Sequence, residues 1–367
     1  MKEIKEKALT GAKLAILLAG AIYCLAFPGE VRAAVSSSAG ICLGVLIPSL
    51  YAMLIVSGLL IKSGALRSLS RLLTPFGRLF FGMDGEVFAI FLLSIFAGYP
   101  VGGRLLASLV REGRLRRREA SLLSGVCFGA GPAFISGCIG ARLYGDPRAG
   151  RIVLLSTLCA DLLLALAISI PIRRAPRLPA EREPLRLSSG LLTDSIISGG
   201  RAMAEICAMV IAFAVLNSAL VRSGALTAAG ALLSRISGRG ETVSGGLLSA
   251  ILDVTAVTRL PEGDPTLLPW ISALTAFGGL CVYLQIAASV RGEFPLLPMF
   301  FLRIAAAVLS YILCRTMLPD GLLMSTAVPA AAVPGAVTSA PSPVPSVLLI
   351  LMTVTVLRER DKLAIKN

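Results

Sequence analysis

The sequence predicts an all-α membrane protein that crosses the bilayer several times. Hydrophobic residues make up 56% of its 367 positions. The mean hydropathy of +0.83 is far above that of an ordinary soluble domain. Several apolar runs reach the roughly 20 residues that a transmembrane helix needs. These runs are continuous rather than alternating, which favours helices over a transmembrane β-barrel.

The apolar runs give an order of segments. Spans are predicted near residues 8–27, 39–61, 119–145, 149–172, 200–221, 266–290 and 296–317, with a weak last span near 343–357. Two further apolar segments, 86–112 and 241–262, are interrupted in the middle. Residues 1–38 are expected to form an N-terminal helix and loop, 173–199 a basic cytoplasmic linker, and 318–367 a Pro-rich connection before the weak span.

Two parts of the chain repeat the same order of elements. The stretch YAMLIVSGLLIKSGAL (51–66) aligns with IAFAVLNSALVRSGAL (211–226), and an amphipathic stretch containing LSR follows each one. An interrupted segment and two spans then complete each unit. Leu- and Ala-rich sequence can produce such matches by chance, but the shared order favours a duplication. The predicted units are 39–172 and 200–317.

The basic residues predict which loops are cytoplasmic, because Lys and Arg accumulate on that side. If each interrupted segment enters the membrane and returns to the same side, the basic stretches 62–78, 111–119 and 173–186 share the cytoplasmic side with the N-terminus. Each unit then has three spans and one re-entrant hairpin built from broken helices. Because three is odd, the two units form inverted repeats, as in many secondary transporters.

Composition also excludes several classes of function. The net charge of +14 is compatible with nucleic-acid binding, but the basic residues lie between apolar spans rather than on one face. The chain has no His, which excludes Ser-His-Asp catalysis and H-E-x-x-H zinc sites. Its eight Cys form no C-x-x-C pair. We therefore expect no enzymatic activity, no metal or cofactor and no nucleic-acid partner.

The first interrupted segment contains the sequence FAGYPVGGR (96–104). Broken backbone at membrane depth is stable only where it faces protein or a water-filled cavity. Gly98 is expected to end one half-helix, and Pro100 lies in the first turn of the next. Paired glycines allow another backbone or a ligand to come close. The predicted substrate contacts are Gly98, Tyr99, Pro100, Gly102, Gly103 and Arg104.

A second break is predicted in CFGAGPAFISGCIG (127–140), where a Gly-Ala-Gly run is followed by Pro132. One Gly-Pro pair in a membrane helix is more often a kink or a packing feature. Two breaks in one unit, with an interrupted segment in the other, favour a binding site. Two helix N-termini aimed at one cavity favour an anionic ligand. The predicted contacts here are Gly131, Pro132, Phe134 and Ser136.

Acidic residues in apolar segments supply further candidates, because a membrane-embedded acid is costly and is often functional. Asp253 and Thr255 lie near the turn of the second interrupted segment and are predicted substrate contacts. Pairing of this acid with Arg259 is the alternative. Asp161 lies deep in an apolar run without a partner nearby in the sequence, so it is the candidate for coupling to H⁺ or Na⁺.

These motifs resemble the sporulation integral membrane proteins of the YlbJ type, built from two nucleoside-recognition Gate domains. The resemblance covers about residues 40–320 and rests on IPSL (47–50), Gly98-Tyr99-Pro100-x-Gly102, Gly131-Pro132-x-Phe134-Ile135-x-Gly137-x-x-Gly140 and Gly145-Asp146-Pro147. It implies a fold similar to that of concentrative nucleoside transporters. It also implies transport of dipicolinic acid across the outer forespore membrane. The chain departs from the usual pattern of this family at two places. Ala130 stands where the family commonly has a hydroxyl residue, and Asp253 stands near the position of its usual Glu.

Three functions follow from these observations. The leading one is a secondary transporter of a small anionic metabolite in the cell membrane, with dipicolinic acid implied by the resemblance. A nucleoside-type transporter is the first alternative, although AGYPVGG (97–103) contains none of the Asn, Gln or Glu that a nucleoside site requires. A non-transporting scaffold for spore-envelope assembly is the second, and it has no need of paired helix breaks. Besides the lipid bilayer, the partners left open are a coupling ion and a second copy in a homo-oligomer.

Overall fold

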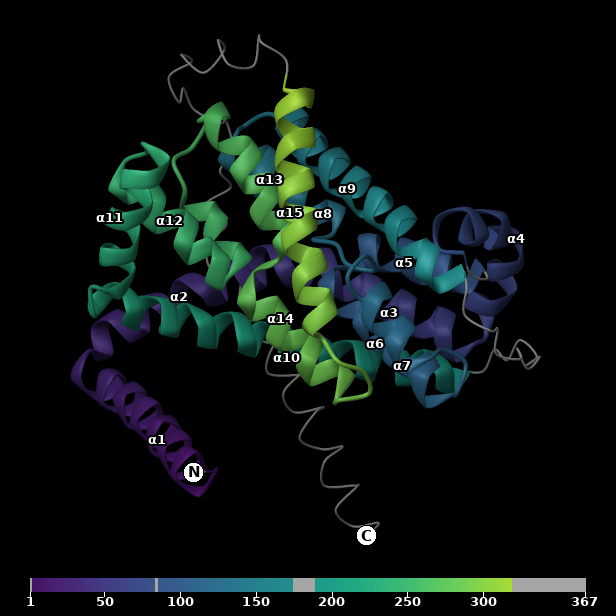
Figure 1. Ribbon diagram of the computed structural model, residues 1–367, viewed down its shortest axis with the longest axis horizontal. Helices are drawn as coiled ribbons and strands as arrows, with labels where there is room; N and C mark the ends of the chain where they lie inside the picture. Colours follow the sequence, from purple (N-terminus) through teal and green to yellow (C-terminus); the bar gives the residue numbers. More distant parts are fainter. Residues whose placement is uncertain (1, 83–84, 174–188, 319–367) are drawn as a thin grey trace.

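The computed structural model describes residues 2–82, 85–173 and 189–318, and every regular element in these ranges is helical (Figure 1). The first half contains α1 (Lys2–Ala26), α2 (Pro28–Ile41), the π-helix η1 (Cys42–Leu46), α3 (Ile47–Lys62), α4 (Ala65–Phe80), α5 (Gly85–Ala97), α6 (Tyr99–Arg111), α7 (Arg117–Leu123), α8 (Pro132–Phe134), the π-helix η2 (Ile135–Leu143) and α9 (Pro147–Arg173). The second half contains α10 (Ser189–Arg222), α11 (Ala225–Ser237), α12 (Glu241–Leu252), the 3₁₀ helices η3 (Val254–Arg259) and η4 (Pro265–Leu267), α13 (Leu268–Phe277), α14 (Gly279–Val290) and α15 (Leu297–Met317).

Five helical runs among the described residues are long and apolar enough to cross a membrane. They are Pro28–Lys62, Pro147–Ile170, Gly190–Arg222, Pro265–Val290 and Leu297–Met317. This finding confirms the prediction of an all-helical, multi-pass membrane protein. The expected span at 119–145 is not among them, because it is divided into α7 and the α8–η2 run. The weak span at 343–357 lies outside the described residues.

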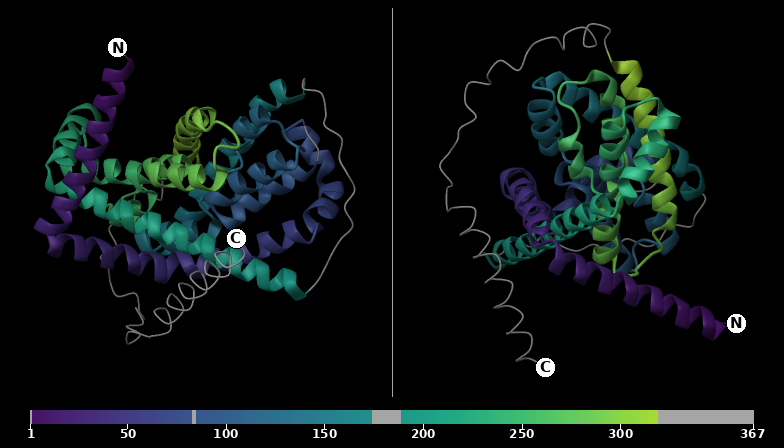
Figure 2. Two further views of the ribbon diagram at one scale, coloured as in Figure 1. Left: turned by 90° about the horizontal axis from the view of Figure 1, so that it is seen from below. Right: turned by 90° about the vertical axis from the view of Figure 1, so that its left-hand side faces the viewer.

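Two helix boundaries differ from the prediction. The run through α2, η1 and α3 begins at Pro28 rather than near residue 39. In the polar stretch before residue 39, Ser38 satisfies its hydroxyl within the helix, because its Oγ donates to the carbonyl oxygen of Ala34 at 2.9 Å. Helix α10 begins at Ser189, so residues 189–199 are helical rather than part of a linker. Helix α1 projects away from the remaining helices in both views of Figure 2.

Helices α5 and α6 form a hairpin whose two ends lie together. Each helix has 13 residues and is therefore about 20 Å long, too short to cross a hydrocarbon core of about 30 Å. Arg114, just after α6, forms an ion pair with Glu86 in the first turn of α5. Because entry and exit are adjacent, this segment has the shape predicted for a hairpin that returns to its own side.

The second interrupted segment also begins and ends at one place, but only its first arm is an α-helix. The guanidinium of Arg239, just before α12, donates to Thr266 Oγ1 at 3.1 Å and to the carbonyl oxygen of Thr266 at 3.0 Å. Helix α12 ends at Asp253. The return path consists of the short helix η3 and irregular chain, because Pro261 and Gly263 follow it closely.

The long helices of the two halves pack in opposite directions. Lys62 at the end of α3 donates to the carbonyl oxygen of Asp194 near the start of α10 at 2.9 Å. At the other end of α10, the hydroxyl oxygen of Ser218 lies 2.8 Å from that of Tyr23, which is near the end of α1, just before α2. Helix α10 is therefore antiparallel to the run α2–η1–α3. Helices α4 and α11 lie at opposite ends of the long axis of the molecule (Figure 1).

Helices α9, α13 and α15 pack against one another, and Figure 1 shows α15 between α13 and α9. The hydroxyl oxygen of Ser272 on α13 lies 2.7 Å from that of Ser156 on α9 and 2.6 Å from that of Ser310 on α15. This chain of three buried hydroxyl groups satisfies polar atoms that lipid could not. It also fixes the relative height of the three helices.

Loop contacts define two ends of the helical body. At one end, a guanidinium nitrogen of Arg111 after the first hairpin lies 3.8 Å from a carboxylate oxygen of Glu293. At the other end, the backbone nitrogen of Gly263 donates to the carbonyl oxygen of Leu143 at 2.9 Å. These are the two groups of loops that the charge pattern assigns to opposite sides. The orientation, with the N-terminus in the cytoplasm, stays a prediction.

We predict that Glu112 and Glu262, both exposed, lie on opposite sides of the membrane. An impermeant maleimide added outside intact cells is expected to label the Glu262→Cys variant at once. The Glu112→Cys variant is expected to react only after permeabilisation, because its loop is strongly basic. The parent protein, with its exposed Cys24, gives the background. Equal labelling of both variants from outside would contradict the hairpin.

Candidate functional site

Three chain breaks from distant parts of the sequence meet around one small internal cavity of about 30 Å³, here called the central cavity. The polar or break-associated residues that line it are Tyr99 and Pro100 between α5 and α6, Ala130 and Phe134 at the break before η2, Asp253 and Thr255 after α12, and Gln285 on α14. Its apolar lining includes Leu46 and Leu50 of the η1–α3 run and Ile206 and Val210 of α10. The structure thus brings together residues from both predicted units.

The breaks at Gly98 and Gly131 have the same local cause. Their φ angles are +90° and +80°, a region that favours glycine because it has no Cβ. A proline follows each glycine within the first turn of the new helix, where its missing N–H costs no hydrogen bond. Leu50 of α3 lies against both breaks: a Cβ on Gly98 would be 3.0 Å from its Cδ2, and one on Gly131 3.4 Å.

The paired glycines of the first hairpin allow close packing, but against protein rather than the cavity. A Cβ added to Gly102 would lie 2.0 Å from the carbonyl oxygen of Cys127. Helix α6 therefore rests on the unwound chain that leads to the second break. A Cβ on Gly103 would lie 2.9 Å from Cγ2 of Ile286 on α14. Neither glycine lines the central cavity.

A further break interrupts the segment 266–290, which the sequence predicts as a span. The run Pro265–Val290 is long and apolar enough to cross a membrane, as predicted. Within it, however, α13 ends at Phe277, and both Gly278 and Gly279 have positive φ, +85° and +84°. A Cβ on Gly278 would lie 2.4 Å from Cζ of Phe128, so the break makes room for a ring from the other half of the chain. In the sequence, this break is marked by the two glycines that follow Phe277, just as a glycine follows Phe128.

Among the described residues, Asp253 is the acidic residue that lines the central cavity, and it is only 5% exposed. Its Oδ1 accepts a hydrogen bond from the backbone nitrogen of Thr255 at 3.1 Å, and its Oδ2 accepts one from Thr255 Oγ1 at 2.6 Å. These bonds cap η3 and hold the carboxylate in place. The alternative partner, Arg259, is partly exposed at the far end of η3.

Arg104 lies in a different place from the one predicted. It lines a wide, open pocket at the Arg111–Glu293 end of the molecule, here called the vestibule, and not the central cavity. The charged residues of the vestibule are Lys62, Arg104, Arg111, Arg201 and Arg291, with Asp194, Glu205 and Glu293. The vestibule therefore carries more positive than negative side chains.

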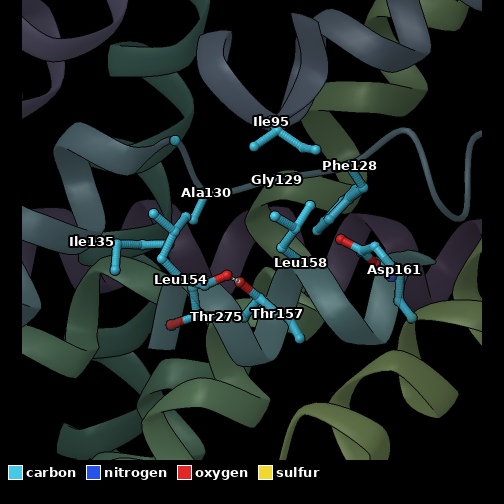
Figure 3. Close-up of a pocket in the computed structure, with 13 residues that line it drawn as sticks. Ile95, Phe128, Gly129, Ala130, Ile135, Leu154, Thr157, Leu158, Asp161 and Thr275 are labelled. Atoms are coloured by element: carbon cyan, nitrogen blue, oxygen red, sulfur yellow. Dashed lines mark hydrogen bonds and ion pairs between the residues drawn. The ribbon is translucent and has the colours of Figure 1, made fainter. Parts of the chain in front are cut away.

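Asp161 lines a second internal cavity of about 20 Å³, here called the ion-pair cavity (Figure 3). As predicted it has no partner nearby in the sequence, but it forms a buried ion pair with Arg303 of the distant helix α15. In Figure 3, Phe128, Gly129 and Ala130 of the unwound chain lie across the cavity from Asp161 and its α9 neighbours. A partner 142 residues away leaves no local signal in the sequence.

Ser136 is one of the predicted contacts that line neither internal cavity; the others are Gly98, Gly102, Gly103, Arg104 and Pro132. Ser136 is exposed on η2, and the linings of the central cavity and the ion-pair cavity do not include it. Its position depends on the pitch of η2, because a π-helix displaces side chains from the faces that an α-helix gives them. Among the described residues, no group of three or more Cys, Asp or Glu side chains could hold a metal ion.

We predict that Gly102→Ala destabilises the protein, because its new Cβ would overlap the backbone of Cys127. The expected cost is about 1–3 kcal/mol, typical of overpacking. The control is Gly137→Ala, whose Cβ would meet no heavy atom within 4 Å. The measurement is thermal unfolding of both purified variants in detergent. Equal stability of the two variants would show that the close contact is absent.

A curated relative has the resemblance expected from the motifs. The sporulation integral membrane protein YlbJ of Bacillus subtilis (strain 168) is 25% identical to this chain, in an alignment that covers 66% of each protein. The chain thus spans just under two thirds of the length of that relative. No family model matches the chain, and no solved structure does. The similarity to a protein of the YlbJ type is therefore confirmed at the level of sequence.

Proposed function

We propose that this protein is a secondary membrane transporter of a small anionic metabolite, and that dipicolinic acid during endospore formation is its substrate. The observation that carries the proposal is the convergence of three chain breaks on the central cavity. Irregular backbone inside a membrane protein typically lines a substrate or ion site. The similarity to YlbJ, a sporulation integral membrane protein, supports the link with sporulation. The substrate crosses unchanged, without enzymatic conversion.

The arrangement of the helices supports alternating access by two inverted repeats. Helices α3 and α10, which hold corresponding places in the two units, run in opposite directions. So do α9 and α15. Each unit also has an interrupted segment whose two ends lie together. In transporters with inverted repeats, one unit moves against the other around a fixed site between them, and the central cavity has this position.

Two features favour an anion. The N-terminus of α6, at Tyr99 and Pro100, faces the central cavity, where the helix dipole favours negative charge. The positive excess of the vestibule raises the local concentration of anions near the cavity. The central cavity, of about 30 Å³, is smaller than the usual sites for small molecules, so the substrate binds only when the cavity widens as one unit moves against the other.

A second candidate, nucleoside transport, is favoured by a specific observation. Asp253, Thr255 and Gln285 bring a carboxylate, a hydroxyl and an amide to one wall of the central cavity. Such groups hydrogen-bond the hydroxyls and base edges of nucleosides. The third candidate, a scaffold for spore-envelope assembly, requires no transported substrate.

Uptake into proteoliposomes tests all three candidates. Purified protein is reconstituted, and the entry of labelled dipicolinate and of labelled uridine is compared with entry into protein-free vesicles. Saturable dipicolinate uptake, inhibited by excess unlabelled dipicolinate and not by uridine, is the expected result. Uptake of uridine alone would support the nucleoside candidate. Uptake of neither, by protein that remains folded and monodisperse, would favour the scaffold.

We predict that Ala130→Leu abolishes uptake while the protein still folds. Ala130 lines both internal cavities, so a larger apolar side chain there fills space that the substrate requires. The matched control is Ala133→Leu, three residues later and exposed, which is expected to transport normally. Uptake and abundance are measured on the same vesicles. Normal uptake by the Ala130→Leu variant would remove the central cavity from the pathway.

We predict that Arg104→Gln raises KM for the anion several-fold with little change in protein abundance. The reason is the loss of one positive charge from the vestibule, which lowers the local anion concentration. Arg104→Lys keeps the charge but loses the planar donor geometry, so its KM is expected to be intermediate. Raising the salt concentration should reduce the difference between Arg104→Gln and the parent protein. A KM unchanged in both variants would contradict this role.

A further inference from the structure

Arg303 is a fully buried cation with an incomplete set of partners. Its side chain is 2% exposed, and one terminal nitrogen pairs with Asp161. Within the part of the chain that the structure describes, no protein acceptor lies within hydrogen-bond distance of its Nε and Nη1. A buried guanidinium normally has its donors satisfied, because each unpaired donor is costly away from water. Two donors are therefore free to bind an acceptor.

The free donors adjoin a small internal cavity. Arg303 and Asp161 both line the ion-pair cavity, together with the unwound residues Gly129–Gly131. Its volume of about 20 Å³ has room for about one water molecule, so a carboxylate group enters only when the cavity widens. The guanidinium presents donors in the planar arrangement that matches a carboxylate, often with two parallel hydrogen bonds. Chemistry and geometry thus fit a carboxylate ligand on Arg303.

Charge balance constrains how such a ligand can bind. With Asp161 ionised, Arg303 already has a counterion, and a second carboxylate would leave net negative charge in a medium of low dielectric constant. Protonation of Asp161 removes this obstacle, because the carboxylate of the ligand then becomes the counterion. For the carboxylate group bound to Arg303, the charge at the pair is the same before and after the exchange; the second carboxylate of a dicarboxylate keeps its own negative charge.

Building on the transport of an anion proposed above, we propose that Asp161 and Arg303 form a proton-for-carboxylate exchange site. The carboxylate of Asp161 takes one proton from water on the entry side and releases Arg303. Nε and Nη1 of Arg303 then donate hydrogen bonds to one carboxylate group of the substrate. Release on the far side reverses both steps. One proton therefore accompanies each substrate molecule, and no covalent bond to the substrate is formed or broken.

The surroundings connect this site to the first hairpin. The Cζ atom of Arg303 lies 4.6 Å from the centre of the Phe128 ring, and that ring centre lies 4.7 Å from the centre of the Tyr99 ring. The hydroxyl of Tyr99 donates to the carbonyl oxygen of Thr275 at 2.9 Å. A change of counterion at Arg303 therefore acts directly on the residues at the turn of the hairpin and at the end of α13.

Few other ionisable groups face the pair within the described residues. Arg303 comes from α15, Cys127 from the chain after α7, and Tyr99 from α6. Helix α13 contributes the hydroxyl group of Thr275 to the cavity. Asp161 is thus the carboxyl group at this site whose protonation can respond to the pH of either compartment.

The test uses reconstituted protein with the membrane potential clamped at zero by valinomycin and equal potassium. In the parent protein, dipicolinate uptake is expected to acidify the vesicle interior. At one proton per anion, one unit of inward pH gradient is expected to give about tenfold accumulation. Asp161→Asn is expected to keep exchange of labelled for unlabelled dipicolinate but to lose its response to the gradient. Arg303→Gln is expected to lose both exchange and net uptake.

Glu262→Gln, which removes an exposed carboxyl group away from both cavities, serves as the control and should keep the response. If the Asp161→Asn protein is not produced in folded form, the Asp161→Glu variant is used instead. The pH of half-maximal uptake should then move upward, since Glu ordinarily titrates above Asp. An unchanged midpoint would overturn the inference. Uptake without acidification, or a gradient response retained in Asp161→Asn, would overturn the exchange site but leave anion transport intact. Absence of any dipicolinate uptake by the parent protein would overturn both.

Discussion

The dominant constraint on this molecule is that broken backbone inside a membrane must be covered by protein. The bilayer core offers no hydrogen-bond partners, so unwound chain at Gly98, Gly131 and Gly278 is stable only if other elements cover it. The breaks cover one another. Helix α6 lies on the carbonyl oxygen of Cys127 through Gly102, and the ring of Phe128 occupies the space left at Gly278. The central cavity is the part of this region that side chains leave unfilled.

The parts of the fold that could be predicted from the sequence depend on local signals. Long apolar runs and Gly-Pro pairs act within a few residues, so the helical class and the breaks at Gly98 and Gly131 were predictable. The break at Gly278 was not, because it accommodates Phe128 from the other half of the chain. Arg303 was not predicted as a site residue for the same reason, because its ion-pair partner Asp161 is 142 residues away in the sequence. Inverted repeats and re-entrant hairpins stay part of the proposal.

The predicted site residues divide according to what each one contacts. Tyr99, Pro100 and Asp253 lie on the central cavity, where helix ends meet. Gly102 has a packing role, because protein backbone occupies the space beside it. The positive charge of Arg104 acts in the vestibule, about a turn of helix away from the hairpin turn. Sequence spacing places a residue on a helix, but the neighbouring helix decides whether that face meets substrate, protein or solvent.

The two internal cavities are mechanically connected, and this connection gives the ion pair its significance. Ala130 lines both cavities, and the rings of Phe128 and Tyr99 extend from Arg303 to the hairpin turn. An arginine held by a single carboxylate contact is expensive to bury, since desolvation can exceed the Coulomb attraction of the pair. A purely structural pair would be more stable with its remaining donors satisfied. Donors kept free beside unwound backbone, in contact with the hairpin through two rings, are instead suited to sensing which carboxylate occupies the site.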